Sequence, residues 1–250
     1  WLYRREGRKL LSFERAAANV ADASLFVTDA EAQLFRDAAP EVTQRIGVMQ
    51  NGVNAEYFSP EHRFDNPYPD GSPVLLFTGA MDYWANIDAV SWFVAEILPA
   101  IRAQLPNVSF WIVGMNPSPA VQALAGNGVT VTGTVADVRP YLAHADVVVA
   151  PLRIARGIQN KVLEAMAMAR PVVLAAAPAN GLEAESGHDC EIAHSADSFV
   201  SLILALLADA GTREAMGQAA RARVLARYAW SAHLAVLDAL LQNKNEQNPG

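Results

Sequence analysis

The sequence predicts an α/β protein built around a doubly wound, Rossmann-like parallel sheet. From Val74 onward, short apolar runs of strand length alternate with amphipathic segments of helix length, a pattern that produces a parallel sheet covered by helices. The chain has 250 residues, of which 52% are hydrophobic, so it can bury a large core. A shorter alternation before residue 55 predicts a second, partial α/β segment.

The partial segment begins with a basic stretch. Residues 1–18 have the pattern of a helix, and strands are predicted over 23–28 and 45–49. Between them, Thr28 and Glu31 have the spacing of a capping box, which predicts a helix over 29–38. The basic side chains of the first helix are Arg4, Arg5, Arg8, Lys9 and Arg15.

The main part of the chain contains the predicted sheet. Its strands are expected over 74–78, 108–113, 129–132, 146–151, 172–175 and 191–194. Its helices are expected over 86–104, 118–125, 137–145, 159–170, 197–208 and 212–241. Residues 66–73 are rich in Pro and Gly, as is typical of a surface loop. Residues 241–250 are mostly polar and are predicted to form a disordered tail.

Net charge, cysteine content and hydropathy indicate which partners and which cellular compartment the protein is expected to have. The net charge of −7 argues against a broad nucleic-acid surface. The single cysteine, Cys190, excludes an internal disulfide and fits a reducing compartment, so we expect a cytoplasmic protein. No apolar run approaches the ~20 residues that span a bilayer. The basic helix over 1–18 can lie on an anionic membrane at its inner face, although a solvated helix face is the commoner explanation.

Residues 146–175 form one predicted βαβ unit that gathers charged side chains at a single end. Arg153, Arg156 and Lys161 surround the start of the helix over 159–170, where unpaired backbone N–H groups already favour an anion. These cations suit a diphosphate. Glu164, one turn further along the same side of the helix, suits the hydroxyls of a ribose. The alternative is that Glu164 only pairs with Lys161 and favours the helix dipole.

Glycines follow three successive predicted strands. Gly79, Gly114 and Gly133 permit sharp turns and a close approach of backbone to ligand, so together they indicate a nucleotide crevice. Val135, just after Gly133, could offer backbone groups to a base. Tyr83 and Trp84 could contact a sugar or a base, but packing is the commoner role of aromatic residues where a helix begins.

The histidines do not have the spacing of metal ligands, so no metal site and no cofactor are predicted. His188 and Asp189 lie in a loop that we expect to face the same crevice, where a structural role is favoured over catalysis.

Three stretches resemble a known family. LEAMAMARPVV after a basic loop, and QNKVLEAMA in particular, is similar to the donor site of family 4 (group 1) retaining glycosyltransferases of the exopolysaccharide type, which have the GT-B fold. The stretch from Asn51 to Pro60 resembles the family's hinge, NGV-x-x-x-x-F-x-P. Arg227 to Ser231 resembles its closing motif, although Trp230 could instead lie in the core of an ordinary amphipathic helix.

The resemblance implies a division of the chain and an activity. Residues 1–55 would be the end of an acceptor-side domain with the hinge, and 56–240 the nucleotide-sugar-binding domain with its closing helix. The implied reaction transfers a hexose with retention from a nucleoside-diphosphate sugar, expected to be a UDP-sugar, to a saccharide or lipid-linked acceptor. The 250 residues alone are expected to be inactive. Glu164 would hold the ribose, and Arg153, Arg156 and Lys161 would stabilise the leaving diphosphate. The candidate catalytic residues are Arg156, Lys161 and Glu164.

One position departs from the family. A second Glu, which touches the donor sugar, usually stands eight positions before Glu164, where this chain has Arg156. Phosphate and ribose binding are still expected, whereas the sugar contact lacks its usual residue. Two other functions therefore stay open: a UDP-sugar 2-epimerase, which shares the fold, and a nucleotide-binding module without turnover.

Overall fold

The computed structural model describes residues 2–69, 71–155, 157–179 and 182–230, with Leu234, Leu237, Leu240 and Leu241 beyond them. The chain forms two compact units. Unit 1 comprises residues 1–51 and 230–250, and unit 2 comprises residues 52–229. The predicted divisions at 55 and 240 differ from these bounds, chiefly because the chain from Trp230 onward belongs to unit 1. Most of the predicted disordered tail lies outside the described residues.

Unit 1 is a small α/β arrangement. Strands β1 (Ser24–Phe26) and β2 (Ile46–Val48) pair in parallel. Helices α1 (Leu2–Val20) and α2 (Asp29–Ala38) contribute buried residues to the same core as β2. The hydroxyl of Thr28 accepts a hydrogen bond from the backbone N–H of Glu31 at 3.2 Å, which confirms the predicted start of α2. A short 3₁₀ helix, η1 (Pro40–Arg45), was not predicted. The buried core of the unit consists of Ala18, Ala32, Phe35, Ala39, Val42 and Ile46.

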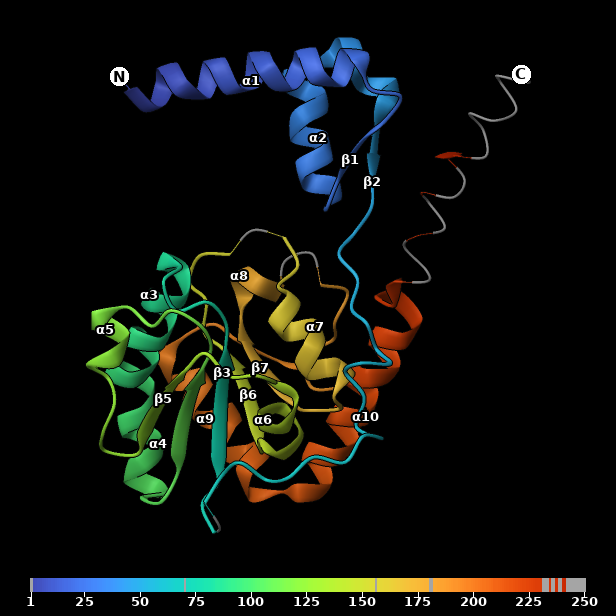
Figure 1. The fold of residues 1–250 in the computed structure, drawn as a ribbon. Coiled ribbons are helices and arrows are strands. Elements are labelled where there is room, and N and C mark those ends of the chain that lie inside the picture. Colours follow the sequence, from blue (N-terminus) through green and yellow to red (C-terminus); the bar gives the residue numbers. More distant parts are fainter. Residues whose placement is uncertain are drawn as a thin grey trace. The chain divides into compact units, whose positions relative to one another are not determined.

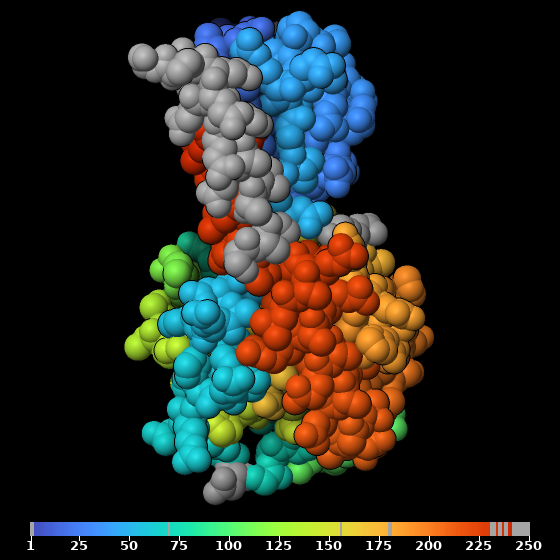
Figure 2. Space-filling view, turned by 90° about the vertical axis from the view of Figure 1, so that its right-hand side faces the viewer, coloured from blue at the N-terminus to red at the C-terminus, as the bar shows by residue number. Residues whose placement is uncertain are grey.

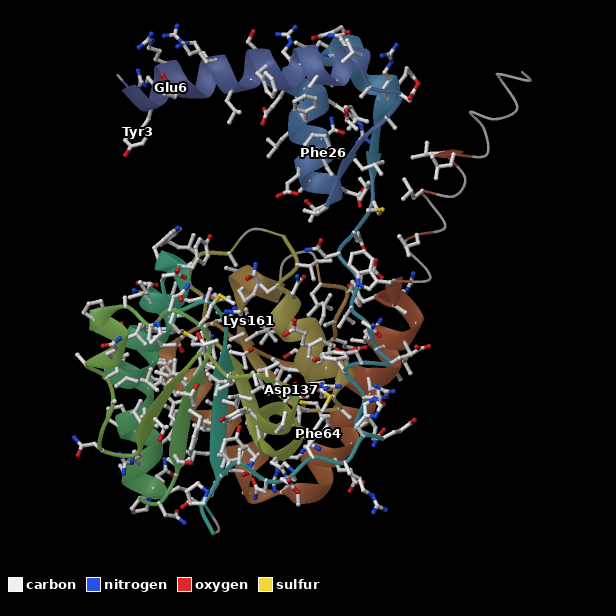
Figure 3. All side chains as sticks on the ribbon, in the orientation of Figure 1. Tyr3, Glu6, Phe26, Phe64, Asp137 and Lys161 are labelled. Atoms are coloured by element: carbon white, nitrogen blue, oxygen red, sulfur yellow. The ribbon has the colours of Figure 1, made fainter. Side chains whose placement is uncertain are left out.

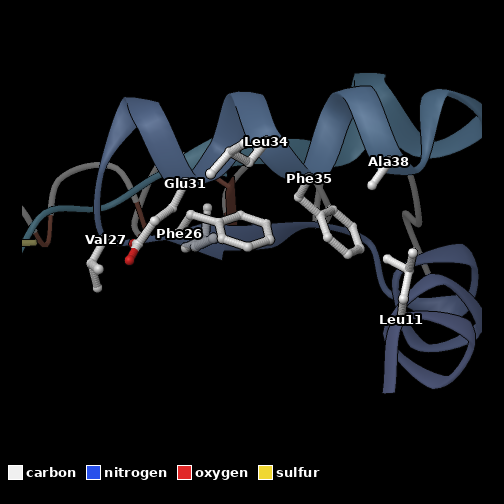
Figure 4. A pocket seen from close by; sticks show the side chains of 8 residues that line it. Leu11, Phe26, Val27, Glu31, Leu34, Phe35 and Ala38 are labelled. Atoms are coloured by element: carbon white, nitrogen blue, oxygen red, sulfur yellow. The ribbon is translucent and has the colours of Figure 1, made fainter. Parts of the chain in front are cut away.

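An apolar groove of about 520 Å³ lies within unit 1 (Figure 4). Leu11, Phe26, Leu34 and Phe35 are among the side chains that line it, and Glu31 is the charged residue of its lining. Leu34 is 70% exposed, so part of the groove is open to solvent.

Unit 2 contains a six-stranded sheet in which every neighbouring pair is parallel (Figure 1). Along the sheet the order is β5-β4-β3-β6-β7-β8. The strands are β3 (Val74–Thr78), β4 (Ser109–Val113), β5 (Val129–Gly133), β6 (Val147–Ala150), β7 (Val172–Ala175) and β8 (Glu191–Ala193). The chain winds outward from β3 in one direction and from β6 in the other, so the predicted doubly wound fold is confirmed.

Alternate residues of each strand face two different layers of helices, because successive side chains in a strand point to opposite faces. Leu75 and Phe77 of β3 pack with helices α3 (Trp84–Trp92), α4 (Leu98–Gln104) and α9 (Ala196–Ala208). Val74 and Leu76 pack with α6 (Arg139–His144), α7 (Asn160–Ala167) and α10 (Ala210–Arg227). Two shorter helices complete the unit, α5 (Pro119–Gln122) and α8 (Ala176–Ala179), of which α8 was not predicted.

The helix predicted over 86–104 is interrupted. A π-helical turn, η2 (Phe93–Ile97), separates α3 from α4, and the N–H of Leu98 donates to the carbonyl of Phe93. Pro99 has no N–H and would clash with a carbonyl of the preceding α-helical turn. The wider π turn accommodates this proline without ending the helix.

Helix α10 ends before the predicted helix does. Its last residue is Arg227, and Tyr228 is fully buried and accepts a hydrogen bond from the N–H of Glu183 at its hydroxyl, at 2.7 Å. Trp230 is 39% exposed, so it is not the core residue that an ordinary amphipathic helix would require. Tyr228, two residues earlier, occupies the core of unit 2.

Arg221 of α10 connects the segment after Gly52 to the rest of unit 2. Its guanidinium donates to the carbonyls of Phe58 and Ala167 and to the hydroxyl of Ser59. Figure 2 shows this segment, in light blue, lying along α10, in orange-red. Because the guanidinium bonds main-chain oxygens of this segment and of α7, it fixes the path of the chain where it enters the unit.

The segment over residues 66–73, predicted to be a surface loop, contains one residue of the core, Tyr68. Tyr68 is 6% exposed, its ring meets that of Trp111 edge-on, and its hydroxyl donates to the carbonyl of Tyr141 at 2.7 Å. Burial raises the pKa of this hydroxyl. The prediction of a surface loop is therefore wrong for Tyr68, while Asp70 lies outside the described residues.

Candidate functional site

The candidate site lies where the order of strands reverses. Strands β3 and β6 are neighbours in the sheet but are far apart in sequence, and the crossovers from each leave in opposite directions. The loops that follow them leave the sheet at its carboxyl edge, and open α/β sheets bind ligands beyond this edge at such a reversal. Gly79 follows β3 at this edge, and the loop after β6 leads to α7, which carries Lys161 (Figures 1 and 3).

Two of the predicted glycines meet at this edge. The N–H of Gly79 donates to the carbonyl of Val113 at 3.1 Å, and a Cβ at Gly114 would overlap the carbonyl oxygen of Gly79. Any side chain at position 114 would therefore force the loops after β3 and β4 apart. A Cβ at Gly79 would stand 2.8 Å from the Nζ of Lys161, so Gly79 leaves the space that this ammonium occupies.

Lys161 reaches from the first turn of α7 to the end of β3. Its Nζ donates to the Oδ1 of Asn86 at 2.6 Å and lies 4.1 Å from the ring centroid of Phe77. The side chain is partly buried, and loss of water around the ammonium lowers its pKa to about 7, while Glu164 acts in the opposite direction. The site therefore holds a lysine that an approaching anion would fully protonate.

Glu164 lies one turn after Lys161 on α7 and is also partly buried. No ion pair joins the two side chains among the described residues, because the ammonium is directed toward Asn86. Burial raises the pKa of the Glu164 carboxyl, and the charge of Lys161 partly opposes this. The alternative in which Glu164 serves as the ion-pair partner of Lys161 is therefore not what the structure contains.

Arg153 is placed differently from Lys161. Its guanidinium forms a two-point ion pair with the carboxylate of Asp88 on α3, with the Nε at 3.0 Å from Oδ2, and it stands over the ring of Trp92. This pairing raises the pKa of Arg153. Since Asp88 already balances its charge, Arg153 offers less positive potential to a ligand than Lys161 does.

Among the described residues, Gly133 and Val135 make no recorded contact with Lys161. Arg156 lies outside the described residues. Gly133 ends β5 at the edge of the sheet with a φ of 72°, and no atom stands within 4 Å of the Cβ that it lacks. Val135 packs against the core residues on the face of the sheet covered by α6, α7 and α10. Their predicted contact with a base is thus neither supported nor opposed by a described side-chain contact.

Two aromatic residues begin α3 at the same edge of the sheet. Tyr83 and Trp84 are 53% and 54% exposed, and their ring centroids are 5.9 Å apart. Packing was the favoured sequence interpretation, but about half of each side chain faces solvent.

The loop with His188 and Asp189 has a structural role. Asp189 is fully buried, and its carboxylate accepts hydrogen bonds from the N–H of Glu185 at 2.7 Å and from the Nε of Arg223 at 2.8 Å. His188 stands 3.9 Å from the same carboxylate and is exposed. The bond to Asp189 raises the pKa of Arg223. The carboxylate thus fastens this loop to α10, as the favoured interpretation required.

Sequence reasoning missed Asn86. This amide is 6% exposed, and the pattern of α3 gave it no signal beyond a polar residue in an apolar helix. A buried polar residue in such a helix needs a partner, so it could have been marked as a candidate, but its partner could not have been named.

The described residues contain no group of three or more His, Cys, Asp or Glu side chains that could hold a metal ion. None of their helices has the length and apolar character required to cross a membrane.

The doubly wound parallel sheet, with the ammonium of Lys161 at its switch point, is an α/β fold of the GT-B type. The family model described as "Glycosyl transferases group 1" matches residues 72–209, which is more than half of the chain. The chain therefore belongs to the group 1 glycosyltransferases. No curated protein sequence matches it significantly.

Solved structures share the fold at low sequence identity. A sucrose-phosphate synthase from Thermosynechococcus elongatus is 20% identical, with a TM-score of 0.74 over 96% of this chain and 63% of its own. A glycosyltransferase from Rickettsia africae is 16% identical, with a TM-score of 0.72 over 89% and 64%. HepE from Anabaena, solved with UDP and glucose, is 18% identical, with a TM-score of 0.67 over 90% and 64%. The chain thus spans less than two thirds of the length of these proteins.

Proposed function

We propose that this chain is the donor-binding part of a retaining glycosyltransferase that moves a hexose from a UDP-sugar to a saccharide or lipid-linked acceptor, in exopolysaccharide-type synthesis at the cytoplasmic face of a membrane. The observation that carries the proposal is the position of the ammonium of Lys161 at the carboxyl end of β3, in a chain that belongs to the group 1 glycosyltransferases. The complex of HepE with UDP and glucose supports the choice of donor.

In the proposed reaction, the bond between the anomeric carbon and the β-phosphate oxygen breaks, and the acceptor oxygen forms its bond on the same face of the sugar. The diphosphate oxygen takes the acceptor proton as UDP leaves. Negative charge grows on the diphosphate during bond breaking, and a fixed cation stabilises that charge more than it stabilises the ground state. Lys161 supplies this cation, and no side-chain nucleophile is needed.

Other residues complete the proposed site. Glu164 accepts hydrogen bonds from the ribose hydroxyls, and Gly79 and Gly114 let the backbone approach the diphosphate. Arg153 contributes at the rim, because its ion pair with Asp88 reduces its share of the charge. The role of Arg156 on the diphosphate stays a prediction from the sequence. No divalent metal is required, because the ammonium provides the countercharge.

Calorimetric titration of the 250-residue chain with uridine, UMP and UDP tests this proposal. Lys161→Met removes the charge and keeps an apolar side chain of similar length. We expect it to weaken UDP binding about 10-fold or more, since a hydrogen bond to a charged group contributes ~1.5–3 kcal/mol, and to leave uridine unchanged. Arg153→Met is the matched comparison, with a loss of about 3-fold or less expected because Asp88 already pairs with Arg153.

Two results would contradict the proposal. If Lys161→Met binds UDP as the parent does, the phosphates lie elsewhere. If UDP binding disappears in chelator and returns with magnesium or manganese, the site needs a metal and the assignment of the countercharge to Lys161 is wrong. Tight UDP binding without donor hydrolysis or transfer in a chain of full family length would instead favour a binding module.

A further inference from the structure

We infer that Asn86 is a positioning residue that holds the ammonium of Lys161 at the carboxyl end of β3. The inference rests on the proposed function, because a diphosphate is the ligand that this ammonium would meet. It concerns a residue that makes no proposed contact with the nucleotide and acts only through Lys161.

The amide of Asn86 has one possible orientation. Its Nδ2 donates to the carbonyl of Ala80 at 2.8 Å, and its Oδ1 accepts from the Nζ of Lys161 at 2.6 Å. A carbonyl oxygen can only accept and an ammonium can only donate, so exchanging the two amide atoms would break both bonds. The side chain is 6% exposed, and water therefore cannot easily replace either partner.

The support of Asn86 extends to the sheet. Ala80 lies between Gly79 and Met81, whose N–H groups donate to the carbonyls of Val113 at 3.1 Å and of Met115 at 2.8 Å. These two bonds fasten the loop after β3 to the end of β4. The carbonyl of Ala80 is thereby fixed on both sides, so the amide and the ammonium have a rigid base.

Asn86 is the acceptor that the ammonium uses among the described residues. The ring of Phe77 lies against the ammonium from β3, and Glu164, the charged group facing it from α7, forms no ion pair with it. An ammonium has more than one N–H to donate. The bond to Asn86 thus fixes its position and leaves donors for phosphate oxygens.

A neutral acceptor has a further effect on Lys161. Burial lowers the pKa of this lysine to about 7, and a hydrogen bond to its charged form favours that form. A carboxylate in place of the amide would raise the pKa further, but it would also place a negative charge beside the diphosphate. Asn86 therefore favours the protonated form of Lys161 without cancelling the charge that binds the ligand.

The test uses the protonation of Lys161 as a readout that a merely structural role would not change. The chain has three lysines, so a sample labelled with ¹³C at the lysine side chain gives a spectrum in which the Lys161→Arg variant identifies the Lys161 signal. Its chemical shift is followed against pH in the 250-residue chain without nucleotide, for the parent, Asn86→Leu and Asn86→Asp. Asn107→Asp, which adds the same charge at the opposite end of the sheet, is the control.

The two variants should move the titration in opposite directions. Asn86→Leu removes the acceptor, so the midpoint of Lys161 should fall by about one pH unit, and Asn86→Asp should raise it by at least as much. The affinity for UDP-glucose should change with the protonation of Lys161. In Asn86→Leu the loss of affinity should be about 5-fold greater at about pH 8 than at about pH 6, because less of the lysine is protonated. In Asn86→Asp binding should be weaker at both pH values and nearly independent of pH.

The outcomes separate this inference from the proposed function. If both variants keep the midpoint of the parent, Asn86 does not position Lys161, even when UDP-glucose binds normally. If the midpoints move as expected but no variant, nor the parent, binds UDP-glucose at any pH, the contact between Asn86 and Lys161 stands and the proposed function fails. A shift of equal size in Asn107→Asp would assign the effect to overall charge and overturn the inference.

Discussion

Single residues at the site differ in how much of their charge is available. Lys161 and Glu164 lie one turn apart on α7, and burial shifts the pKa of each toward its neutral form. Arg153, nearer to solvent, already shares its charge with Asp88. The unbound site therefore stores an unfavourable electrostatic state, which a ligand with both phosphates and hydroxyls would relieve.

Glu164→Gln tests this state, because it should change stability and binding in opposite directions. Since the folded-state pKa of Glu164 is raised, its ionised form destabilises the fold at neutral pH, and stability rises as pH falls through that pKa. The neutral amide should increase the free energy of unfolding by ~1 kcal/mol. UDP affinity should fall about 10-fold, through loss of a charged acceptor for the ribose.

Thermal unfolding and calorimetry of the same samples measure both effects. Glu96→Gln, an exposed position on η2, is the control and should change neither quantity. If Glu164→Gln binds UDP with the affinity of the parent, Glu164 does not bind the ribose.

The sequence predicted part of the site and could not predict the rest. Lys161, Glu164 and Gly79 follow from local patterns, namely a basic helix start and a glycine at a strand end. Asn86 is 75 positions away from Lys161, and only the pairing of β3 with β6 brings the two helices together. The ion pair of Arg153 with Asp88 likewise depends on packing between elements, so the sequence alone could not show that Asp88 shares the charge of Arg153.

At the scale of elements, α10 fastens the loop over residues 183–190 by two ion pairs of different burial. Arg223 pairs with Asp189, which is fully buried, whereas Arg227 pairs with Glu183 at 3.5 Å, and both of those side chains are more than half exposed. The two arginines stand one turn apart on one helix, so they form a matched pair for measuring the effect of burial.

Arg223→Ala leaves the carboxylate of Asp189 buried without its cation. We expect the free energy of unfolding to fall by about 3–5 kcal/mol. Arg227→Ala removes an exposed ion pair and should cost about 0–1 kcal/mol. Urea denaturation of both variants gives the comparison. Equal losses would show that solvent reaches Asp189 and that the loop is not fastened by this contact.

Sequence patterns predicted the bounds of strands better than the bounds of helices. Strands β3, β6 and β7 were predicted within a residue or so because they are short apolar runs buried on both sides of a sheet. The bounds of helices were less predictable, since the π turn before Pro99 and the left-handed backbone at Ala169, with a φ of 53°, depend on local geometry. Ala169 ends α7 earlier than the proline at 171 required.

For the whole molecule, the division into two units predicts an independent fragment. All described residues of the candidate site lie within unit 2, which has its own two-sided core. We expect residues 52–229 alone to unfold cooperatively and to bind UDP within about 3-fold of the affinity of the 250-residue chain. Circular dichroism on heating and calorimetry check both points. A fragment that folds but loses UDP would place part of the site outside unit 2.

The parallel bridge between Val53 and Ala229, with the N–H of Val53 donating to the carbonyl of Tyr228 at 2.8 Å, has a consequence for how such proteins can be recombined. It brings the first and last residues of unit 2 side by side. Because the two ends of unit 2 lie beside each other, the unit can be inserted into another protein through two neighbouring junctions, and the backbone of that protein need not change. Chimeras that join unit 2 to a foreign partner domain need to match only the two junctions beside this bridge.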